Sequence, residues 1–142
     1  MMINGRKVEA YNVTVKLHAD SRTPYLSITA CGTDHIAVNG RVLQRSLLLM
    51  PEQLLEDWGP ADFSTLTPAQ IETLASMPWD VLLLGTGQRQ RFPSPVLLRP
   101  IYETGRGTEI MDTPAACRTY NLLASEGRLV CAALIIESGG AT

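Results

Sequence analysis

The sequence has few of the residues on which catalytic and metal sites are usually built. Its 142 residues include two histidines and three cysteines. The histidines, His18 and His35, lie 17 residues apart, and no two cysteines have the CxxC spacing of a zinc or redox motif. This shortage argues against a metal site. We assign no catalytic residue, no metal ligand and no cofactor from the sequence.

Charged residues are also scarce, at 18% of the chain, and the formal net charge is −2. Proteins that bind nucleic acids or anionic membrane surfaces usually carry an excess of lysine and arginine. The charge balance therefore excludes a nucleic-acid partner as the main function. Hydrophobic residues make up 45% of the chain, which is ordinary for a globular protein. Its length suits one domain, and we expect residues 1–142 to form it, with a core over about 8–136 and a frayed tail at 137–142.

Long hydrophobic runs are absent. The longest strongly apolar run, "LVCAALII" at Leu129–Ile136, is too short to span a bilayer as a helix. The N-terminal "MMINGRKVEA" lacks the apolar core of a secretory signal and the Arg-rich, acid-poor character of a transit peptide. An odd number of cysteines favours a reducing compartment. We therefore expect a cytoplasmic protein without stable membrane insertion.

The first half of the chain has the pattern of strands followed by a helix. "VEAYNVTVKL" (8–17) and "YLSITA" (25–30) are rich in β-branched and aromatic residues, and Asn39-Gly40 between two apolar runs predicts a type I′ hairpin. Thr67 is the expected N-cap of a helix that has Pro68 in its first position and stops at Pro78.

From Asp80 onward, short apolar strands alternate with helices. We predict strands at 81–84, 109–111 and 130–135, a helix at 94–105 interrupted by Pro100, and a helix at 114–126 with Thr113 as its N-cap. Apolar strands without alternation, separated by helices, are typical of a mainly parallel sheet that is covered on both faces. The predicted class is α/β.

The loop after the first of these strands is a candidate anion site. Gly85, Thr86 and Gly87 end a buried strand, where backbone N–H groups can face a ligand, and Arg89 and Arg91 add positive charge. The match to a nucleotide fingerprint is incomplete, because Gln90 stands where GxGxxG has its third glycine and no P-loop lysine follows. The alternative is a tight turn with solvated arginines.

The helix that starts after Thr113 supplies two further candidates. Its N-terminus is expected in the same crevice, with Thr113 and Arg118 as ligand-binding residues. Cys117 falls in the first turns, where the helix dipole lowers a thiol pKa, but no histidine is placed beside it by the sequence. A buried cysteine that packs a helix on a sheet is the favoured interpretation, and a reactive thiol is the alternative.

Three segments resemble a known family: "GRVLQRSLLLMP" (40–51), "VLLLGTG" (81–87) and "MDTPAACRTYNLLASEGRLVCAALI" (111–135). The family is the one that includes mitochondrial complex I (NADH dehydrogenase) assembly factor three, together with many bacterial and archaeal proteins of unknown function. The likeness runs from about Ile36 to Ile136. Its most specific part is the last segment, where these residues follow the family order: Asp112, Thr113, Ala116, Cys117, Asn121, Glu126, Gly127 and Arg128.

The resemblance implies a three-layer α/β/α sandwich with extra antiparallel N-terminal strands and no established enzymatic activity. It also implies a role in assembling membrane respiratory complexes through protein contacts. The N-terminus shows no mitochondrial presequence, so we expect a prokaryotic homologue in the cytoplasm.

Two functions remain open at this stage. The first is a non-enzymatic interaction or assembly-factor-like domain with a protein partner. The second is a domain or enzyme that binds a small anionic ligand through the Gly85-Thr86-Gly87 loop and the N-terminus of the helix at Pro114.

Overall fold

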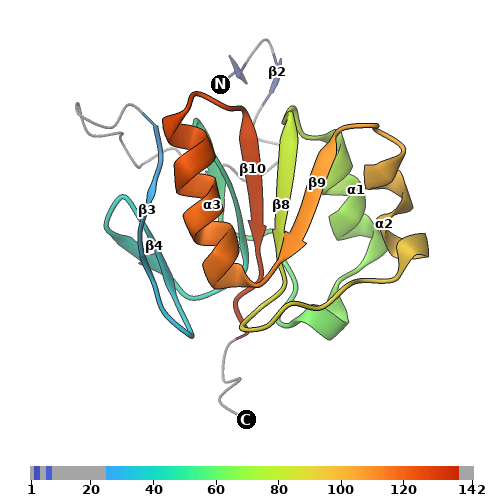
Figure 1. The fold of residues 1–142 in the computed structure, drawn as a ribbon, viewed down its shortest axis with the longest axis horizontal. Helices are drawn as coiled ribbons and strands as arrows, with labels where there is room; N and C mark the ends of the chain where they lie inside the picture. The colour runs from blue at the N-terminus through green and yellow to red at the C-terminus, as the bar shows by residue number, and fades with distance from the viewer. Residues whose placement is uncertain (1, 4–5, 8–24, 138–142) are drawn as a thin grey trace.

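The computed structural model describes residues 2–3, 6–7 and 25–137 (Figure 1). The predicted strand at 8–17 lies outside these residues. Near the N-terminus, β1 (Met2–Ile3) and β2 (Arg6–Lys7) pair antiparallel. The remaining elements are β3 (Ile28–Cys31), β4 (Ile36–Val38), β5 (Arg41–Leu43), β6 (Leu47–Met50), β7 (Gln53–Leu55), the short 3₁₀ helix η2 (Phe63–Thr65), α1 (Pro68–Ser76), β8 (Val81–Gly85), α2 (Pro95–Tyr102), β9 (Gly107–Met111), α3 (Thr113–Ser125) and β10 (Val130–Leu134).

The central sheet has five strands in the order β7-β6-β10-β8-β9. The predicted neighbours β8, β9 and β10 are adjacent and parallel, as expected for strands joined by crossover helices. The other two pairings, β6 with β10 and β6 with β7, are antiparallel. The sheet is therefore mixed, and the prediction of a mainly parallel sheet was wrong in this respect. The antiparallel part of the sheet is the β6–β7 hairpin. Its two strands are joined directly, since antiparallel neighbours need no crossover helix.

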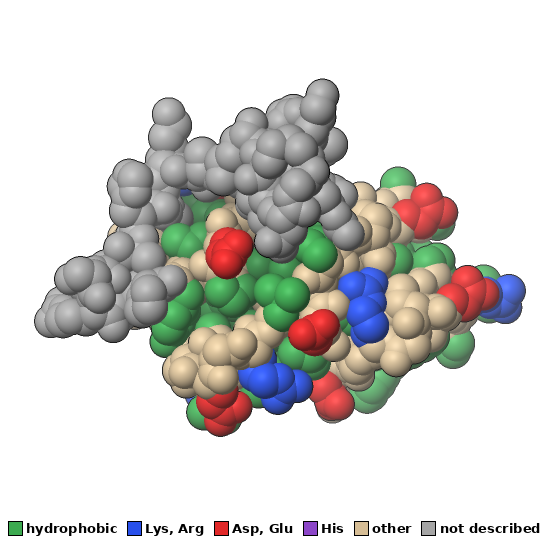
Figure 2. Space-filling view, turned by 90° about the horizontal axis from the view of Figure 1, so that it is seen from above, with side chains coloured by type: hydrophobic (Ala, Val, Ile, Leu, Met, Phe, Trp, Pro, Cys, Tyr) green, Lys and Arg blue, Asp and Glu red, His purple; other side chains and the backbone are tan. Residues whose placement is uncertain are grey.

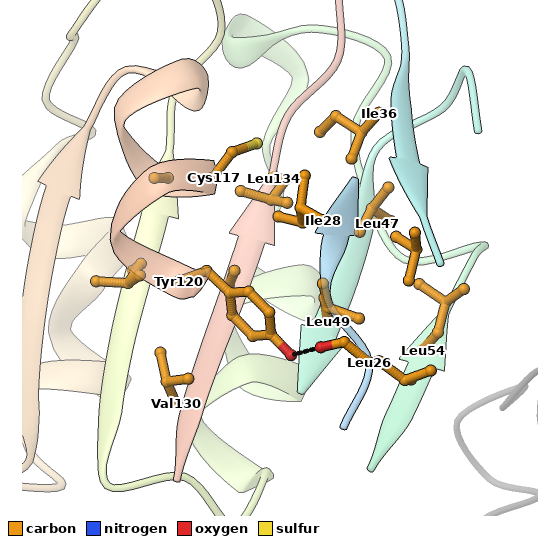
Figure 3. Close-up of a cluster of buried hydrophobic side chains, with 14 of the residues drawn as sticks. Leu26, Ile28, Ile36, Leu47, Leu49, Leu54, Cys117, Tyr120, Val130 and Leu134 are labelled. Carbon is orange, nitrogen blue, oxygen red and sulfur yellow. Dashed lines mark hydrogen bonds between the residues drawn. The ribbon is translucent and has the colours of Figure 1, made fainter. Parts of the chain in front are cut away.

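The two faces of this sheet carry separate hydrophobic clusters. Alternate side chains of β10 and of Ile135, which follows it, enter them, as the two-residue period of a strand requires. Val130, Ala132 and Leu134 join the first cluster, and Cys131, Ala133 and Ile135 join the second. The first cluster contains α3 and the small antiparallel sheet β3-β4-β5, whereas the second contains α1 and α2 (Figures 1 and 3). The α/β class is confirmed. One face is covered by a helix and a second sheet together.

Two local signals, the Asn39-Gly40 turn and the Thr67 cap, are found where the sequence placed them. Asn39 and Gly40 both have positive φ, at 48° and 85°, and join β4 to β5 as the type I′ turn requires. Thr67 caps α1 in a reciprocal capping box with Gln70. These features depend on neighbouring residues only, which is why the sequence predicts them well.

A single arginine fastens the end of α1 to the start of β9. The Arg106 guanidinium donates hydrogen bonds to the carbonyl oxygens of Ala75 (2.6 Å), Met77 (2.7 Å) and Trp79 (2.8 Å). Its central carbon also lies 3.6 Å from the centre of the Trp79 ring. The positive charge therefore satisfies carbonyl groups that the helix end leaves open and stacks on an aromatic face at the same time.

We predict that Arg106→Met lowers the free energy of unfolding by about 2–4 kcal/mol, because it removes charged hydrogen bonds and the cation–π contact. Arg99→Met is the control, since Arg99 is an exposed arginine on α2 and its loss is expected to change stability by less than about 0.5 kcal/mol. Urea denaturation of both variants measures the difference. Equal losses in the two variants would contradict this role of Arg106.

Candidate functional site

The candidate site lies at the carboxyl ends of β8 and β9. The chain leaves β8 toward α2 on one face of the sheet and leaves β9 toward α3 on the other face. Ligands of open α/β sheets bind at such a topological switch point. The residues predicted from the sequence therefore lie at a topological switch point of the sheet.

At this switch point, the Gly85–Gly87 loop folds back on the protein. The Thr86 N–H donates to the Met111 carbonyl at 2.9 Å, and the Thr86 hydroxyl donates to the Arg89 carbonyl at 2.8 Å. The Arg91 N–H in turn donates to the Thr86 hydroxyl oxygen at 3.0 Å. Thr86 is fully buried. The hydrogen bonds of its N–H and hydroxyl groups therefore fix the conformation of the loop.

Thr113 brings the loop, the helix and the last strand together. Its hydroxyl donates to the Ile135 carbonyl (2.8 Å) and accepts from the Gly87 N–H (2.8 Å), while its own N–H donates to the Gly87 carbonyl (2.7 Å). Gly85 allows this approach, since a Cβ there would lie 3.0 Å from the Thr113 Cα. The loop and the start of α3 thus meet.

The N-cap of α3 is Asp112, so the prediction of Thr113 as the cap was wrong. The Asp112 carboxylate accepts from the Ala115 N–H at 2.7 Å, and its backbone carbonyl accepts from the Ala116 N–H. Both Asp and Thr are good N-caps. Here the Thr113 hydroxyl is engaged in tertiary hydrogen bonds, which leaves the capping role to the preceding residue. Because Pro114 has no N–H, every donor in the first turn has a partner within the chain.

The anion beside Gly87 is the protein's own Glu137. One Glu137 oxygen is 2.7 Å from an Arg91 guanidinium nitrogen, and the other accepts from the Phe63 N–H at 3.0 Å. The same Arg91 guanidinium donates to the Thr86 carbonyl and lies over the Phe63 ring, 4.7 Å from its centre. A carboxylate and its counter-ion therefore occupy the end of β8 where an external anion was expected.

The remaining predicted site residues are not drawn into this arrangement. Arg89 and Arg118 are exposed. Among residues 25–137, neither side chain has a hydrogen bond or ion pair with another side chain. Sequence reasoning missed Glu137, which was assigned to the tail. The available signal was its place directly after the buried strand, since the carboxyl ends of parallel strands meet at one edge.

Cys117 has the environment of a packed side chain. It is 3% exposed and its thiol points toward the β3–β4 side of the first hydrophobic cluster (Figure 3). Burial raises the pKa of the Cys117 thiol far above its usual range, the neighbouring Cys31 raises it further, and the charge of Arg118 lowers it by a smaller amount. Burial likewise raises the pKa of Cys131 to about 12. A thiol held protonated and shielded from solvent is poorly suited to attack a substrate that arrives from solution, which supports the packing interpretation.

The described residues form neither a metal-ligand cluster nor a membrane-spanning helix. No group of three or more His, Cys, Asp or Glu side chains is arranged to hold a metal ion in that part of the chain. No helix within it is long and apolar enough to cross a membrane.

Comparison with known proteins places the chain among related sequences. Residues 28–135 match the family model described as "Protein of unknown function (DUF498/DUF598)". The chain is 33% identical over 109 residues to bovine NADH dehydrogenase [ubiquinone] 1 alpha subcomplex assembly factor 3, a match that covers 72% of this chain and 56% of that protein. The chain therefore matches little more than half the length of this curated relative.

Two solved bacterial structures share the fold. A Bordetella parapertussis protein is 36% identical with a TM-score of 0.73, covering 79% of this chain and 96% of its own. A Xanthomonas campestris protein is 38% identical with a TM-score of 0.72, covering 89% of this chain and 96% of its own.

The Glu137–Arg91 pair generates a prediction for Gly87. Its φ is +100°, and an added Cβ would lie 2.5 Å from the nearer Glu137 oxygen and 2.7 Å from Arg91. Gly105 is a matched control, because its φ is +73° but no atom lies within 4 Å of an added Cβ. We expect Gly105→Ala to cost about 1–2 kcal/mol of backbone strain. Gly87→Ala should cost at least about 1 kcal/mol more, because it also disrupts a charged hydrogen bond.

Urea denaturation compares the two variants. In the Gly87→Ala background, a further Glu137→Ala change should recover part of the loss, because it removes the carboxylate oxygen that is nearest to the new methyl group and leaves the Arg91 side chain free to move away. Equal losses for Gly87→Ala and Gly105→Ala would show that the ion pair does not depend on Gly87.

Proposed function

Because the chain belongs to the family described as "Protein of unknown function (DUF498/DUF598)", with a curated relative named as a NADH dehydrogenase assembly factor, we propose that it is a non-enzymatic interaction domain of the assembly-factor type. Its partner in this proposal is a protein that takes part in building a respiratory NADH dehydrogenase. The class of partner is taken from the bovine relative. The physical support is the arrangement of residues at the carboxyl ends of β8 and β9.

The observation that carries the proposal is that the polar groups at the carboxyl end of β8 are bound by the protein itself. An enzyme needs a space where substrate meets a nucleophile, an acid–base group or an oxyanion donor. Here the Gly87 N–H is bound by Thr113, and Arg91 is neutralised by Glu137. These groups form bonds that stabilise the fold. The same bonds make the groups poorly suited to bind or activate a substrate.

Exposed apolar side chains offer a surface for a partner. The connection from β8 to β9 carries three of them, Phe92 at 68% exposed, Val96 at 69% and Tyr102 at 51%. Large apolar side chains held in water favour burial against another protein. We propose that this connection is part of the contact surface.

The opposite end of the molecule, where β8, β9 and β10 begin, carries a hydrophobic area with charged side chains around it. In Figure 2, hydrophobic side chains gather in the middle of the visible surface, with acidic and basic side chains around them. Leu129 is exposed in the loop that leads into β10 there. Charges of both signs do not favour a polyanionic partner, which agrees with a protein as the binding partner.

We further propose a three-layer α/β/α arrangement, with the β3-β4-β5 sheet as an addition beside α3, and a cytoplasmic location in a prokaryotic cell. Helices on both faces of the central sheet support the first proposal. The three cysteines Cys31, Cys117 and Cys131, all free, support a reducing compartment.

Affinity purification tests the partner proposal. The wild-type chain, expressed with a tag in its native host, should retain subunits or assembly proteins of a respiratory NADH dehydrogenase, identified by mass spectrometry. The double variant Phe92→Ser, Val96→Ser should retain on the order of tenfold less or lower, since each buried apolar side chain is worth about 1.5–3 kcal/mol. Val42→Ser, at an exposed valine on β5, is the control and should bind as the wild type does.

Two results would contradict the proposal. Absence of NADH dehydrogenase proteins from the wild-type sample would remove the partner class. Equal retention by the wild type and the double variant would remove the β8–β9 connection from the contact surface.

The alternative function is a small anionic ligand bound by Gly85, Thr86, Gly87, Arg89, Thr113 and Arg118. It is favoured by one observation, the meeting of the loop with the start of α3 through Thr113. A ligand would have to displace the Glu137 carboxylate from Arg91, and the exposed Arg89 and Arg118 would have to turn toward it.

Thermal melting tests the alternative. At constant ionic strength, phosphate, ATP or NADH at a hundredfold excess over its Kd should stabilise the fold by about 2.7 kcal/mol and raise the melting temperature by several degrees. The double variant Arg89→Ala, Arg118→Ala should lose this shift and keep the wild-type melting temperature without ligand. If no ligand shifts the wild type beyond the salt control, the alternative fails.

A further inference from the structure

Two cysteines of this chain lie on segments that pack against each other. Cys31 ends β3 and Cys117 lies on α3. In the β3–β4 ladder, Cys31 pairs with Ile36. Directly opposite residues of an antiparallel pair project from the same face, with Cβ atoms about 5 Å apart. Since Ile36 belongs to the same hydrophobic cluster as Cys117, the Cys31 side chain projects toward the face that packs on α3.

The alignment of β3 with α3 brings the two cysteines to the same level. Asn121 fixes it, because its side-chain oxygen accepts from the Ile28 N–H at 2.9 Å and its nitrogen donates to the Ile28 carbonyl at 2.7 Å. The Tyr120 hydroxyl donates to the Leu26 carbonyl farther back along the chain (Figure 3). From Ile28, β3 continues to Cys31, and from Asn121 one helical turn leads back along α3 to Cys117. Both paths run in the same direction from the Ile28–Asn121 contact.

The two thiols have different access to solvent. Cys31 is exposed, whereas its neighbour Cys117 is buried. Cys131, the third cysteine, lies in the other hydrophobic cluster, across the central sheet from Cys117. A small oxidant therefore reaches Cys31 first, and the nearest thiol to the oxidised sulfur is Cys117.

We propose that Cys31 and Cys117 are a modification site that forms a reversible intramolecular disulfide on exposure to hydrogen peroxide. In the first step, the Cys31 sulfur attacks one peroxide oxygen, the O–O bond breaks, and Cys31 sulfenic acid and water form. In the second step, the Cys117 sulfur attacks the Cys31 sulfur, its thiol proton leaves with the hydroxyl group as water, and the S–S bond forms. Two thiols are oxidised, and one peroxide is reduced to two waters. A dithiol such as dithiothreitol reverses the reaction.

The disulfide would join the small β3-β4-β5 sheet covalently to α3. Its loop, from 31 to 117, encloses the strands β4 to β9 together with η2, α1 and α2. Cross-linking so long a loop restricts the unfolded chain strongly, and we expect the melting temperature to rise by on the order of 5–10 °C.

The test uses the full chain, reduced and then treated with hydrogen peroxide under native conditions. Free thiols are blocked with iodoacetamide in denaturant, and peptide mass spectrometry maps the links. We expect a Cys31–Cys117 disulfide, a free Cys131 and the stated rise in melting temperature, all reversed by dithiothreitol. Cys31→Ser and Cys117→Ala should abolish the link, and Cys131→Ala should keep it. Because Cys31 is exposed, Cys31→Ser keeps the fold even if Cys117→Ala does not.

Oxidation of the unfolded chain is the matched control. In denaturant, loop closure favours the shorter Cys117–Cys131 link, so a Cys31–Cys117 link that dominates only under native conditions reports the fold. Three outcomes would overturn the proposal: a stable sulfenic or sulfinic acid on Cys31 with Cys117 free, a dimer linked through Cys31, or no reaction of Cys31.

Discussion

The hydroxyl of Thr113 holds together the end of the molecule where a ligand was expected. It contacts the loop after β8 and the carbonyl that follows β10, and it does so from the first residue of α3. Three segments distant in the sequence thus share one buried oxygen. Without a partner for each of these polar groups, closing this end of the sheet would cost several kcal/mol. Gly85 and Gly87 serve the same contact, since their missing side chains let the helix and Glu137 approach.

This arrangement explains how a sequence can resemble a binding site that the fold uses for its own stability. Glycines at a strand end, nearby arginines and a helix N-terminus are the parts of many anion sites. In this protein, the loop arginine that binds an anion is Arg91, and the anion is the Glu137 carboxylate. The parts are those of a binding site, with the ligand supplied from the protein's own chain. In the proposed function, recognition of another protein depends instead on the surface, where side chains such as Phe92 are exposed.

The success of the sequence-based predictions depended on distance along the chain. The Asn39-Gly40 turn, the Thr67 cap and the parallel β8, β9 and β10 follow from local chemistry and from crossover handedness. The antiparallel half of the sheet did not follow, because nothing near Leu47–Met50 specifies β10 as its neighbour. The same reason applies to Asp112 and Thr113: either residue can cap a helix, and the choice was made by Ile135 and Gly87.

The order of the central sheet has a consequence for how the chain is made. β10 lies between β6 and β8, yet it follows every other described strand in the sequence. While the ribosome is still adding residues before Val130, the hairpin half and the crossover half of the sheet have no strand to join them. Both hydrophobic clusters also lack the side chains that alternate along β10. Folding of this sheet is therefore completed after synthesis of its central strand, and a nascent chain that stalls earlier exposes two unpaired strand edges to chaperones and to other chains.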